Sequence, residues 1–333
     1  MEHGSVTLSQ LFKFFEAAAL VQGSTKHKCR TAVRKAIAAL GDVVAAAVTV
    51  PMAGEYQVKM RNSGMSIASV RSYAGSMAQV FTWAVENRLL AGNPFAEARR
   101  MRPLRREPVT FDPEELADLK SAAADKWRRD PTAQIRWFFI IEIGSTSALR
   151  AGEIQNLRWE DIDLETATIH VQYRPDRFGE HWEWGTKGLT DRLAPMSQES
   201  LEAAYRLREV AAWRYPTLKR CTCEALQARV GSIPELVRKQ PYQDFYIELR
   251  GIRELANQRR RARGVGPMKN GGIHCLRKTA VSDWARQGVP MADAQYVAGH
   301  RSMMTTREYY VAVDHSHAVE SVRARINRGT WAR

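Results

Sequence analysis

Two histidines, an arginine and a tyrosine follow one another at short intervals near the C-terminus of this 333-residue chain. They are His274, Arg277, His300 and Tyr309. Arginine binds two phosphate oxygens with its planar guanidinium, and histidine transfers a proton near neutral pH. A tyrosine hydroxyl is a competent covalent nucleophile once nearby cations compensate its charge. Together these residue types indicate nucleophilic attack on a phosphate group.

A second arginine stands well upstream. Arg150 precedes the helix-forming segment Ala-Gly-Glu-Ile-Gln-Asn-Leu, and an acidic stretch follows at residues 160–163. Lys187 lies between the two arginine segments, on a predicted polar turn in Gly-Thr-Lys-Gly. Taken alone, an arginine that opens a helix is most often salt-bridged or solvated, and a lysine on a polar turn is most often exposed. The order of these residues along the chain is therefore the informative signal.

The ordered set resembles the catalytic boxes of the tyrosine recombinases (phage integrase family), which share the plan of their catalytic domain with type IB topoisomerases. The resemblance implies a catalytic set made of Arg150, Lys187, His274, Arg277, His300 and Tyr309. One departure is Ser147, which replaces the usual glycine of the first box and is expected to tighten the turn. Tyr310 competes with Tyr309 for the role of nucleophile, and the Thr-Thr-x-x-Tyr spacing favours Tyr309.

The resemblance also implies a mechanism. Tyr309 attacks a backbone phosphorus of DNA, displaces the 5′ oxygen and forms a 3′-phosphotyrosyl bond, while the two arginines stabilise charge on the non-bridging oxygens. His300 donates a hydrogen bond to the same oxygens, and His274 assists proton removal from the tyrosine. Lys187 is the general acid for the leaving oxygen. No metal and no cofactor is expected, because the arginines supply the positive charge.

The composition agrees with a nucleic-acid partner. Fifty Lys and Arg against 36 Asp and Glu give a net charge of +14, so attraction to a polyanion is expected. Carboxylates for two-metal nuclease chemistry are not apparent, and Glu153 and Asp163 are expected to be structural or to orient arginines.

The cysteines and the apolar segments indicate a cytoplasmic protein, associated with the nucleoid when bound to DNA. The four cysteines are few and scattered, which predicts free thiols in a reducing compartment. Cys221 and Cys223 form a pair that lacks the further ligands of a metal site. No signal-peptide pattern opens the chain, and no apolar run reaches the length of a membrane span.

The expected fold is mainly α with a small antiparallel β-sheet, and 44% hydrophobic content over this length is ample for two domains. Residues 1–105 are expected to form a helical DNA-binding domain that resembles the core-binding domain of integrases. Its clearest helix begins after Ser66 and is stopped at residues 92–94. Residues 106–333 are expected to form the catalytic domain, with a C-terminal tail.

Within the catalytic domain the sheet is expected at residues 168–173, 182–184 and 192–195, with Lys187 at the turn. A helix over residues 276–287 is expected to carry Arg277. Residues 205–265 are expected to be helical, without a detailed assignment.

Two basic clusters are candidate phosphate contacts. One is a proline-containing extended linker, for which the alternative is a soluble linker that happens to be basic. The other lies within the helical segment, where a solvated helix end is the alternative. The candidate DNA-binding residues are Arg99, Arg100, Arg102, Arg105, Arg106, Arg259, Arg260 and Arg261.

The function that the resemblance implies is site-specific DNA recombination, with integration or excision of a mobile element. The implied partners are a double-stranded recombination site, further copies of the chain in a tetramer on synapsed DNA, and accessory DNA-bending or directionality proteins, with no membrane. A helical pattern over residues 317–326 is expected either to fold on its own subunit or to dock on a neighbouring one, and the resemblance implies the second. The alternatives are a topoisomerase-like strand transferase of type IB and a DNA-binding protein of the same fold without catalysis.

Overall fold

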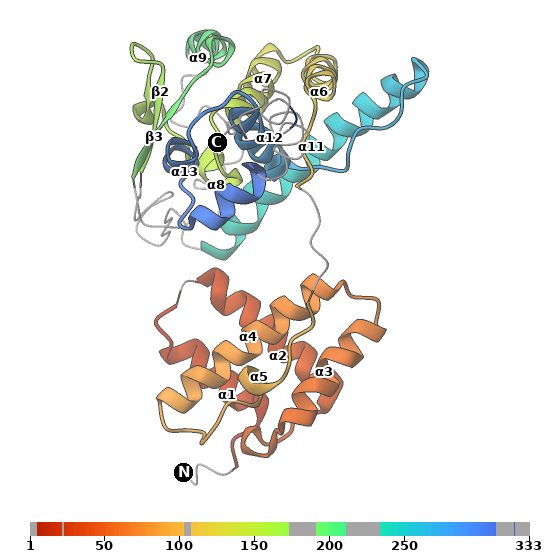
Figure 1. Ribbon diagram of the computed structural model, residues 1–333, viewed down its shortest axis with the longest axis vertical. Helices are drawn as coiled ribbons and strands as arrows, with labels where there is room; N and C mark the ends of the chain where they lie inside the picture. Colours follow the sequence, from red (N-terminus) through yellow and green to blue (C-terminus); the bar gives the residue numbers. More distant parts are fainter. Residues whose placement is uncertain are drawn as a thin grey trace, which may run out of the picture. The chain divides into compact units, whose positions relative to one another are not determined.

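The computed structural model describes residues 5–21, 23–102, 108–172, 191–210, 234–310 and 323. The chain forms two compact units, Met1–Arg106 and Glu107–Arg333, which are drawn in Figure 1. The described residues are mostly helical, with one three-stranded antiparallel sheet. The prediction of a mainly α fold with a small sheet is confirmed.

The first unit is a bundle of helices. In chain order its elements are α1 (Leu8–Ala18), α2 (Gly23–Leu40), the 3-10 turn η2 (Ala45–Ala47), α3 (Val50–Asn62), α4 (Ile67–Glu86) and α5 (Pro94–Glu97). Sequence-local side-chain caps fix the starts of α1, α3, α4 and α5. Thr7 begins α1 with a capping box, in which its hydroxyl accepts from the N–H of Gln10 and the Gln10 side chain accepts from the N–H of Thr7.

The helix expected after Ser66 is α4. The Ser66 side chain accepts from the N–H of Ser69, and apolar side chains at three- and four-residue spacing are buried, as the pattern predicts. The expected stop at residues 92–94 is wrong. The helix ends at Glu86 because the chain turns at Arg88, which has a positive φ of 58°, and residue 93 caps α5 instead.

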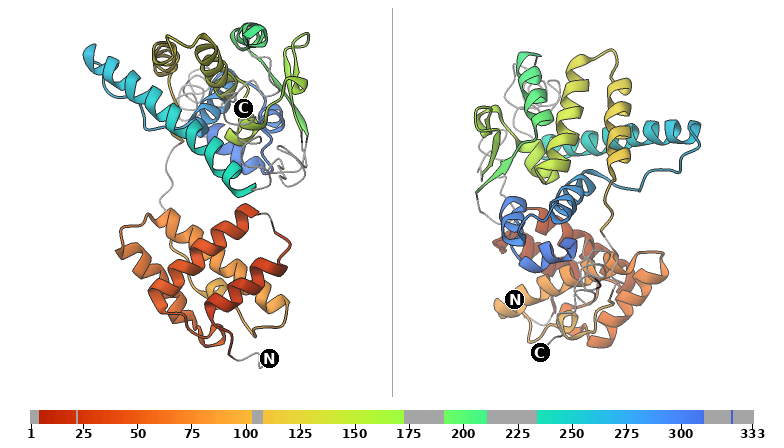
Figure 2. Two further views of the ribbon diagram at one scale, coloured as in Figure 1. Left: turned by 180° about the vertical axis from the view of Figure 1, so that it is seen from behind. Right: turned by 45° about the horizontal axis from the view of Figure 1, so that its top comes forward.

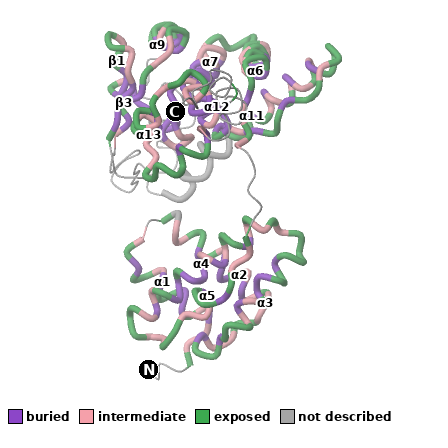
Figure 3. Tube along the Cα trace, in the orientation of Figure 1, coloured by how far each residue is buried: buried purple, intermediate pink, exposed green. Residues whose placement is uncertain are grey.

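Aromatic side chains fill the core of the first unit. The ring of Phe95 lies edge-on to Tyr56, with 5.7 Å between centroids, and 5.1 Å from Phe81. Phe15 of α1 meets Trp83 of α4 edge-on at 5.6 Å. Figure 3 shows buried positions on α2, α3 and α4 where these helices face one another. Tertiary packing of these faces gives the unit its own hydrophobic core.

The second unit packs helices around α7. In chain order its elements are α6 (Pro113–Lys126), α7 (Pro131–Thr146), α8 (Ala151–Asn156), the 3-10 turn η3 (Trp159–Asp161), β1 (Ile162–Asp163), β2 (Thr168–Val171), β3 (Arg192–Pro195), α9 (Gln198–Val210), α11 (Pro234–Ala262), α12 (Ile273–Arg286) and α13 (Met291–Ala298). Residues 303–310 are also helical. α7 contacts α6, α9 and α12, and Figure 2 shows that one end of α11 extends beyond the other helices of the unit.

The sheet has the order β1-β2-β3, and β2 pairs with β3 in the register Ile169 to Ala194. Two of the three expected strands are therefore observed. The third, residues 182–184, and the turn with Lys187 lie outside the described residues. The first strand, β1, was not predicted, because two residues are too few to show an alternating pattern.

In the described part of the chain, no helix combines the length and the apolar character of a membrane span. No group of three metal-binding side chains was found among those residues. Cys29 and Cys275 are buried free thiols, whereas Cys221 and Cys223 lie outside the described residues.

Candidate active site

Different elements of the second unit carry the predicted catalytic residues. Arg150 is the N-cap of α8, His274 and Arg277 lie on the first turns of α12, and His300 follows the end of α13. Tyr309 lies in the helical residues 303–310. The contacts described below bring Arg150, Arg277, His300 and Tyr309 together. Lys187 lies outside the described residues.

The backbone before Arg150 makes a sharp turn. α7 ends at Thr146, and Ala148 has a positive φ of 53° although it is not glycine. Ser147, which replaces the usual glycine, has a negative φ of −94° and needs no glycine there. Its hydroxyl is buried without a hydrogen-bond partner among the described residues. The turn is therefore made by the alanine, not tightened at the serine.

The backbone at His300 is fixed by a helix C-terminal motif. Gly299 has a φ of +63°. The N–H of Gly299 donates to the carbonyl of Tyr296 at 2.9 Å, and the N–H of His300 donates to the carbonyl of Gln295 at 3.1 Å. This pair of bonds is the Schellman arrangement, which favours glycine at its left-handed position. The chain direction at His300 is thereby set by α13.

Arg150 is held on both sides. Its Nη1 donates to Glu153 Oε1 at 2.7 Å, its backbone N–H donates to Glu153 Oε2 at 2.7 Å, and its Nη2 donates to the carbonyl of Gly299. Burial alone would raise the pKa of Glu153. Hydrogen bonds and charge from Arg192, with the charge of Arg150, outweigh burial and lower that pKa to about 2. The carboxylate therefore stays ionised beside Arg150.

Arg277 is almost fully buried, with 2% of its surface exposed. Its Nη1 donates to the carbonyl of Ala148, and its Nη2 donates to the carbonyl of Ala298 at 2.6 Å. Burial, with the positive charge of Arg150, lowers its pKa to about 9. At neutral pH the guanidinium remains protonated, so two cations stand close together in this site.

His300 is an uncharged imidazole at neutral pH. Burial, together with the charges of Arg277 and Arg150, lowers its pKa to about 3. Its Nδ1 lies 3.0 Å from the hydroxyl of Thr306. With that hydroxyl as donor, the hydrogen of the neutral ring is on Nε2, where it is available to an oxygen of a substrate.

The candidate nucleophile lies beside this histidine. Tyr309 has 7% of its surface exposed, and its ring stacks on that of His300. Burial raises the pKa of its hydroxyl, and the charge of Arg277 acts in the opposite direction. Tyr310 is half-buried, and its hydroxyl donates to the carbonyl of Val289 at 2.6 Å. The hydroxyl of the competing tyrosine is thus used within the fold.

His274 is exposed on α12, and its charge contributes to the lowered pKa of His300. Arg192 is a further residue of this site that was not predicted from the sequence. This residue is buried at the start of β3, binds Glu153 with both terminal nitrogens, and donates through Nε to the carbonyl of Val297. No motif includes Arg192. The one sequence signal is its position, because it begins a short predicted strand directly after the turn that carries the candidate lysine.

The candidate DNA-binding arginines fall into different environments. Arg99 and Arg102 are exposed and Arg100 is half-buried, while Arg105 and Arg106 lie outside the described residues.

For the second basic cluster, the assignment of Arg260 to phosphate is corrected. Arg260 is buried, and its Nη1 binds Asp118 of α6 at 2.7 Å. Arg259 forms an ion pair with Asp125 of the same helix. Arg261 is exposed and donates to the carbonyl of its own helix at residue 257. The first two of these arginines attach α11 to α6, which the sequence could not reveal because the acidic partners lie far upstream.

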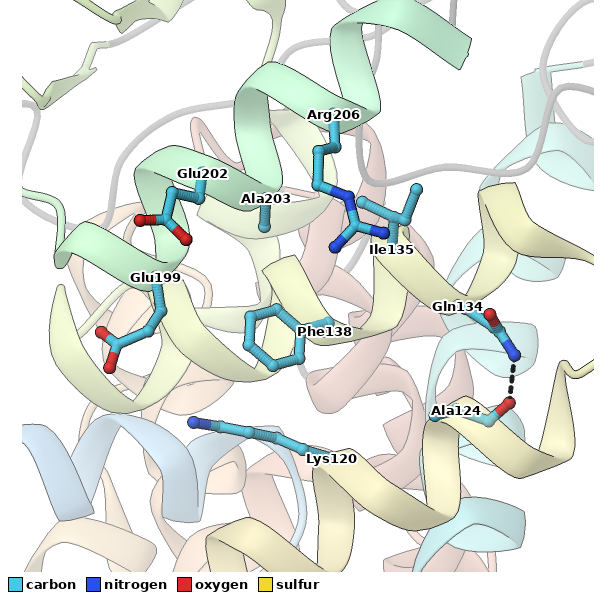
Figure 4. Close-up of a pocket in the computed structure, with 9 residues that line it drawn as sticks. All are labelled: Lys120, Ala124, Gln134, Ile135, Phe138, Glu199, Glu202, Ala203 and Arg206. Carbon is cyan, nitrogen blue, oxygen red and sulfur yellow. Dashed lines mark hydrogen bonds between the residues drawn. The ribbon is translucent and has the colours of Figure 1, made fainter.

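A pocket of about 290 Å³ lies elsewhere in the second unit, between α6, α7 and α9 (Figure 4). Lys120 and Phe138 line it beside Arg206, with Glu199 and Glu202 on the wall formed by α9. The ammonium of Lys120 lies 5.3 Å from the centre of the Phe138 ring and pairs with the carboxylate of residue 142. None of the candidate catalytic side chains that the structure describes lines this pocket.

The sequence of this chain is similar to a known protein family and to individual proteins of that family. Residues 110–317 match the model of the phage integrase family. The tyrosine recombinase XerC of Xylella fastidiosa (strain M23) is 24% identical over 246 residues, which cover 74% of this chain and 70% of that protein. A XerC-like tyrosine recombinase of Caldanaerobacter subterraneus is 23% identical over 284 residues, covering 80% of this chain and 68% of the relative.

Solved structures show the same fold at low identity. The integrase of transposon Tn1549, solved in complex with a circular intermediate DNA, superposes with a TM-score of 0.71 at 19% identity, covering 97% of this chain and 100% of that one. A lambda integrase dimer bound to a core site gives 0.63 at 15% identity, with 92% and 78% coverage. Because the family model covers more than half of its length, the chain belongs to the phage integrase family, the tyrosine recombinases that cleave and rejoin DNA strands.

Proposed function

We propose that this chain is a site-specific recombinase that exchanges DNA strands through a 3′-phosphotyrosine formed by Tyr309. One observation carries the proposal. The tyrosine lies stacked against His300, and the two carbonyls just before that histidine accept hydrogen bonds from Arg277 and Arg150. A nucleophile, a neutral donor and two cations therefore converge from four separate segments of the chain.

The arginines stabilise the transition state. As Tyr309 attacks phosphorus, negative charge builds on the non-bridging oxygens, and fixed cations there lower the barrier more than they stabilise bound DNA. A guanidinium has five N–H donors. Within the described residues, Arg150 and Arg277 each use donors on both terminal nitrogens and keep further N–H groups for phosphate.

The remaining groups handle protons. Nε2 of His300 donates to a non-bridging oxygen. The raised pKa of Tyr309 keeps its hydroxyl protonated at neutral pH, and His274 assists removal of that proton in this proposal. Lys187 protonates the 5′ oxygen as it leaves. The phosphotyrosine conserves the energy of the broken bond, so rejoining needs no nucleotide.

The partners follow from the same proposal. Lambda integrase has been solved as a tetramer bound to a Holliday junction, and we propose an equivalent tetramer of this chain on two paired duplex sites. We further propose that it acts in the cytoplasm, on the ends of a mobile element, with accessory DNA-bending or directionality proteins. The expected docking of residues 317–326 on a neighbouring subunit stays a prediction, because these residues lie outside those described.

Covalent trapping tests the proposal. The full chain is incubated without metal, in chelator, with a pool of nicked duplexes tiled across the DNA that flanks its gene. A nick near the cleavage point lets a short fragment diffuse away and traps the phosphotyrosine on a denaturing gel. We expect an adduct that Tyr309→Phe abolishes and Tyr310→Phe keeps. An adduct that survives Tyr309→Phe, or tight binding without any adduct, would contradict the proposal.

A further inference from the structure

The end of α13 is attached to three arginines. Arg192 Nε donates to the carbonyl of Val297 at 2.7 Å. The next two carbonyls along the chain accept from Arg277 and from Arg150. Carbonyls at a helix C-terminus have no partner within the helix, and they carry the negative end of its dipole. Two of these arginines belong to the predicted catalytic set, and Arg192 does not.

The other end of Arg192 reaches the carboxylate that orients Arg150. Its Nη1 donates to Glu153 Oε1 at 3.0 Å and its Nη2 to Glu153 Oε2 at 2.6 Å, which is the bidentate geometry of a strong charged pair. The side chains of Arg192 and Glu153 are 3% and 2% exposed. Because the pair is buried, solvent screens it little and its geometry is well defined.

Arg192 also lies directly against the backbone that leads to His300. A Cβ placed on Gly299 would stand 3.1 Å from Cδ, Nε and Cζ of Arg192. The guanidinium therefore fills the space beside the residue whose left-handed conformation turns the chain toward the histidine. Any change in the size or position of Arg192 alters the support of that turn.

We propose that Arg192 is a positioning residue for strand cleavage, which joins the carboxylate that orients Arg150 to the helix end that presents His300. The inference rests on the proposed function, since it assigns a role in the same reaction. The alternative is that Arg192 and Glu153 form a buried ion pair that only stabilises the fold. The two differ in outcome, because a purely stabilising pair affects the melting temperature without a specific effect on the rate of bound, folded enzyme.

Arg260 provides a matched control. It is also a buried arginine of the second unit, paired with Asp118 at 2.7 Å, with 8% and 9% of the two side chains exposed. Its partner lies on α6, and none of its described hydrogen bonds reaches the candidate site. Arg260→Gln therefore measures what the loss of a buried charged pair does by itself.

The experiment measures three quantities for the wild type, Arg192→Gln, Arg192→Lys and Arg260→Gln. They are the melting temperature, the Kd for the nicked duplex that gives the strongest wild-type adduct, and the rate of adduct formation at saturating DNA, well below each melting temperature. We expect Arg192→Gln to lower the rate about a hundredfold, with Kd changed less than about threefold. Arg192→Lys should recover part of the rate, since it keeps the charge. Arg260→Gln should have a lower melting temperature than the wild type and the same rate of adduct formation.

A sulfur-substituted duplex separates positioning of Arg150 and His300 from an effect on the leaving group. When the bridging 5′ oxygen is replaced by sulfur, the leaving thiolate needs no proton, because a thiol is far more acidic than an alcohol. The contacts of Arg192 lead to groups that serve the non-bridging oxygens. The defect of Arg192→Gln is therefore expected to persist on this substrate.

Two results would overturn the inference while the proposed function stands. One is an active wild type with an Arg192→Gln rate that is unchanged, or reduced no more than in Arg260→Gln. The other is full recovery of Arg192→Gln on the sulfur substrate. A wild type that forms no adduct on any duplex is a separate outcome, which overturns the proposed function and this inference with it.

Discussion

The ring of Tyr309 stacks on the ring of His300, with 6.0 Å between the centroids and 13° between the planes. The same imidazole contacts the Thr306 hydroxyl through Nδ1. Thr306 and Tyr309 are three residues apart on one helical segment and so lie on the same face. The proposed nucleophile and the residue that binds the imidazole therefore belong to one helical segment. A movement of that segment toward a phosphate would also change the position or the hydrogen bond of His300.

Replacing the imidazole by a ring of similar shape separates stacking from hydrogen bonding. His300→Phe keeps an aromatic partner for Tyr309 and removes the donor, so the rate of adduct formation should fall about a hundredfold. The free energy of unfolding should fall by about 1–2 kcal/mol, because the buried Thr306 hydroxyl loses its partner. Single-turnover kinetics and urea unfolding measure the two effects. A wild-type rate in His300→Phe would show that the imidazole is not a donor in the reaction.

The lowered pKa of His300 predicts how stability depends on pH. The pKa is about 3 in the folded chain against an ordinary value of 6.5, so the unfolded chain takes up a proton in the range between them. The contribution of this group is complete above pH 6.5 and is lost as the pH falls toward 3. Urea unfolding at pH 7 and pH 4.5 should therefore show a smaller loss for His300→Phe than for the wild type. An equal loss would mean that the imidazole titrates normally.

Gly299 should tolerate no side chain. Gly299→Ala places Cβ at a φ of +63° and 3.1 Å from Arg192, so we expect a loss of about 1–2 kcal/mol from the backbone and a further loss from displacing the guanidinium. Gly288→Ala is the control, because its φ of +77° is similar and an added Cβ meets nothing within 4 Å. Thermal unfolding and adduct rates compare the two. Equal effects in both would contradict the crowding of Arg192.

Ala148 should accept glycine and reject valine. Glycine removes about 1 kcal/mol of left-handed strain at the φ of 53° and loses a buried methyl group of about the same value, so Ala148→Gly should remain near wild type. A β-branched side chain at this fully buried position should cost about 2–4 kcal/mol and displace the carbonyl that binds Arg277. The check is unfolding of both variants with their adduct rates. A stable, active Ala148→Val would contradict the turn geometry.

A salt titration of DNA binding should distinguish basic residues that contact phosphate from those that form internal ion pairs. If exposed Arg102 contacts a phosphate, Arg102→Gln should reduce the slope of log K against log salt by about 1. Arg260→Gln should leave the slope unchanged, because its guanidinium is committed to Asp118. Fluorescence anisotropy on one duplex at several salt concentrations measures both. An unchanged slope in Arg102→Gln would remove this residue from the predicted DNA interface.

The family could be predicted from the sequence because ordered residue types survive in the chain as short motifs, and the catalytic set taken from those motifs stays a prediction. Arg192 could not be predicted, and its strand shows why. An alternating strand is expected to bury Leu193 and to expose its charged neighbour. The structure does the reverse, with Arg192 buried and Leu193 50% exposed, because the arginine has a buried carboxylate as partner. That partner is 39 residues away along the chain, beyond any local pattern.

The same limit explains the correction at Arg260. A cluster of arginines at a helix end is typical of a phosphate-binding surface, and no acidic residue stands within four positions of Arg259, Arg260 or Arg261 in the sequence. Its partner Asp118 is 142 residues upstream. Pairings of this kind depend on which helices pack together. The caps at Thr7 and Ser66 depend only on neighbours within three residues, so they could be predicted.

The attachment of Arg192 to a carbonyl rather than to a side chain has a consequence for variation. The acceptor is the backbone of Val297, and every amino acid supplies the same carbonyl there. A substitution of Val297 can therefore change the volume and packing of that side chain while the hydrogen bond to Arg192 is kept. Substitutions of the α13 side chains can therefore change the surface of this helix while the hydrogen-bond acceptors of Arg192, Arg277 and Arg150 stay in place.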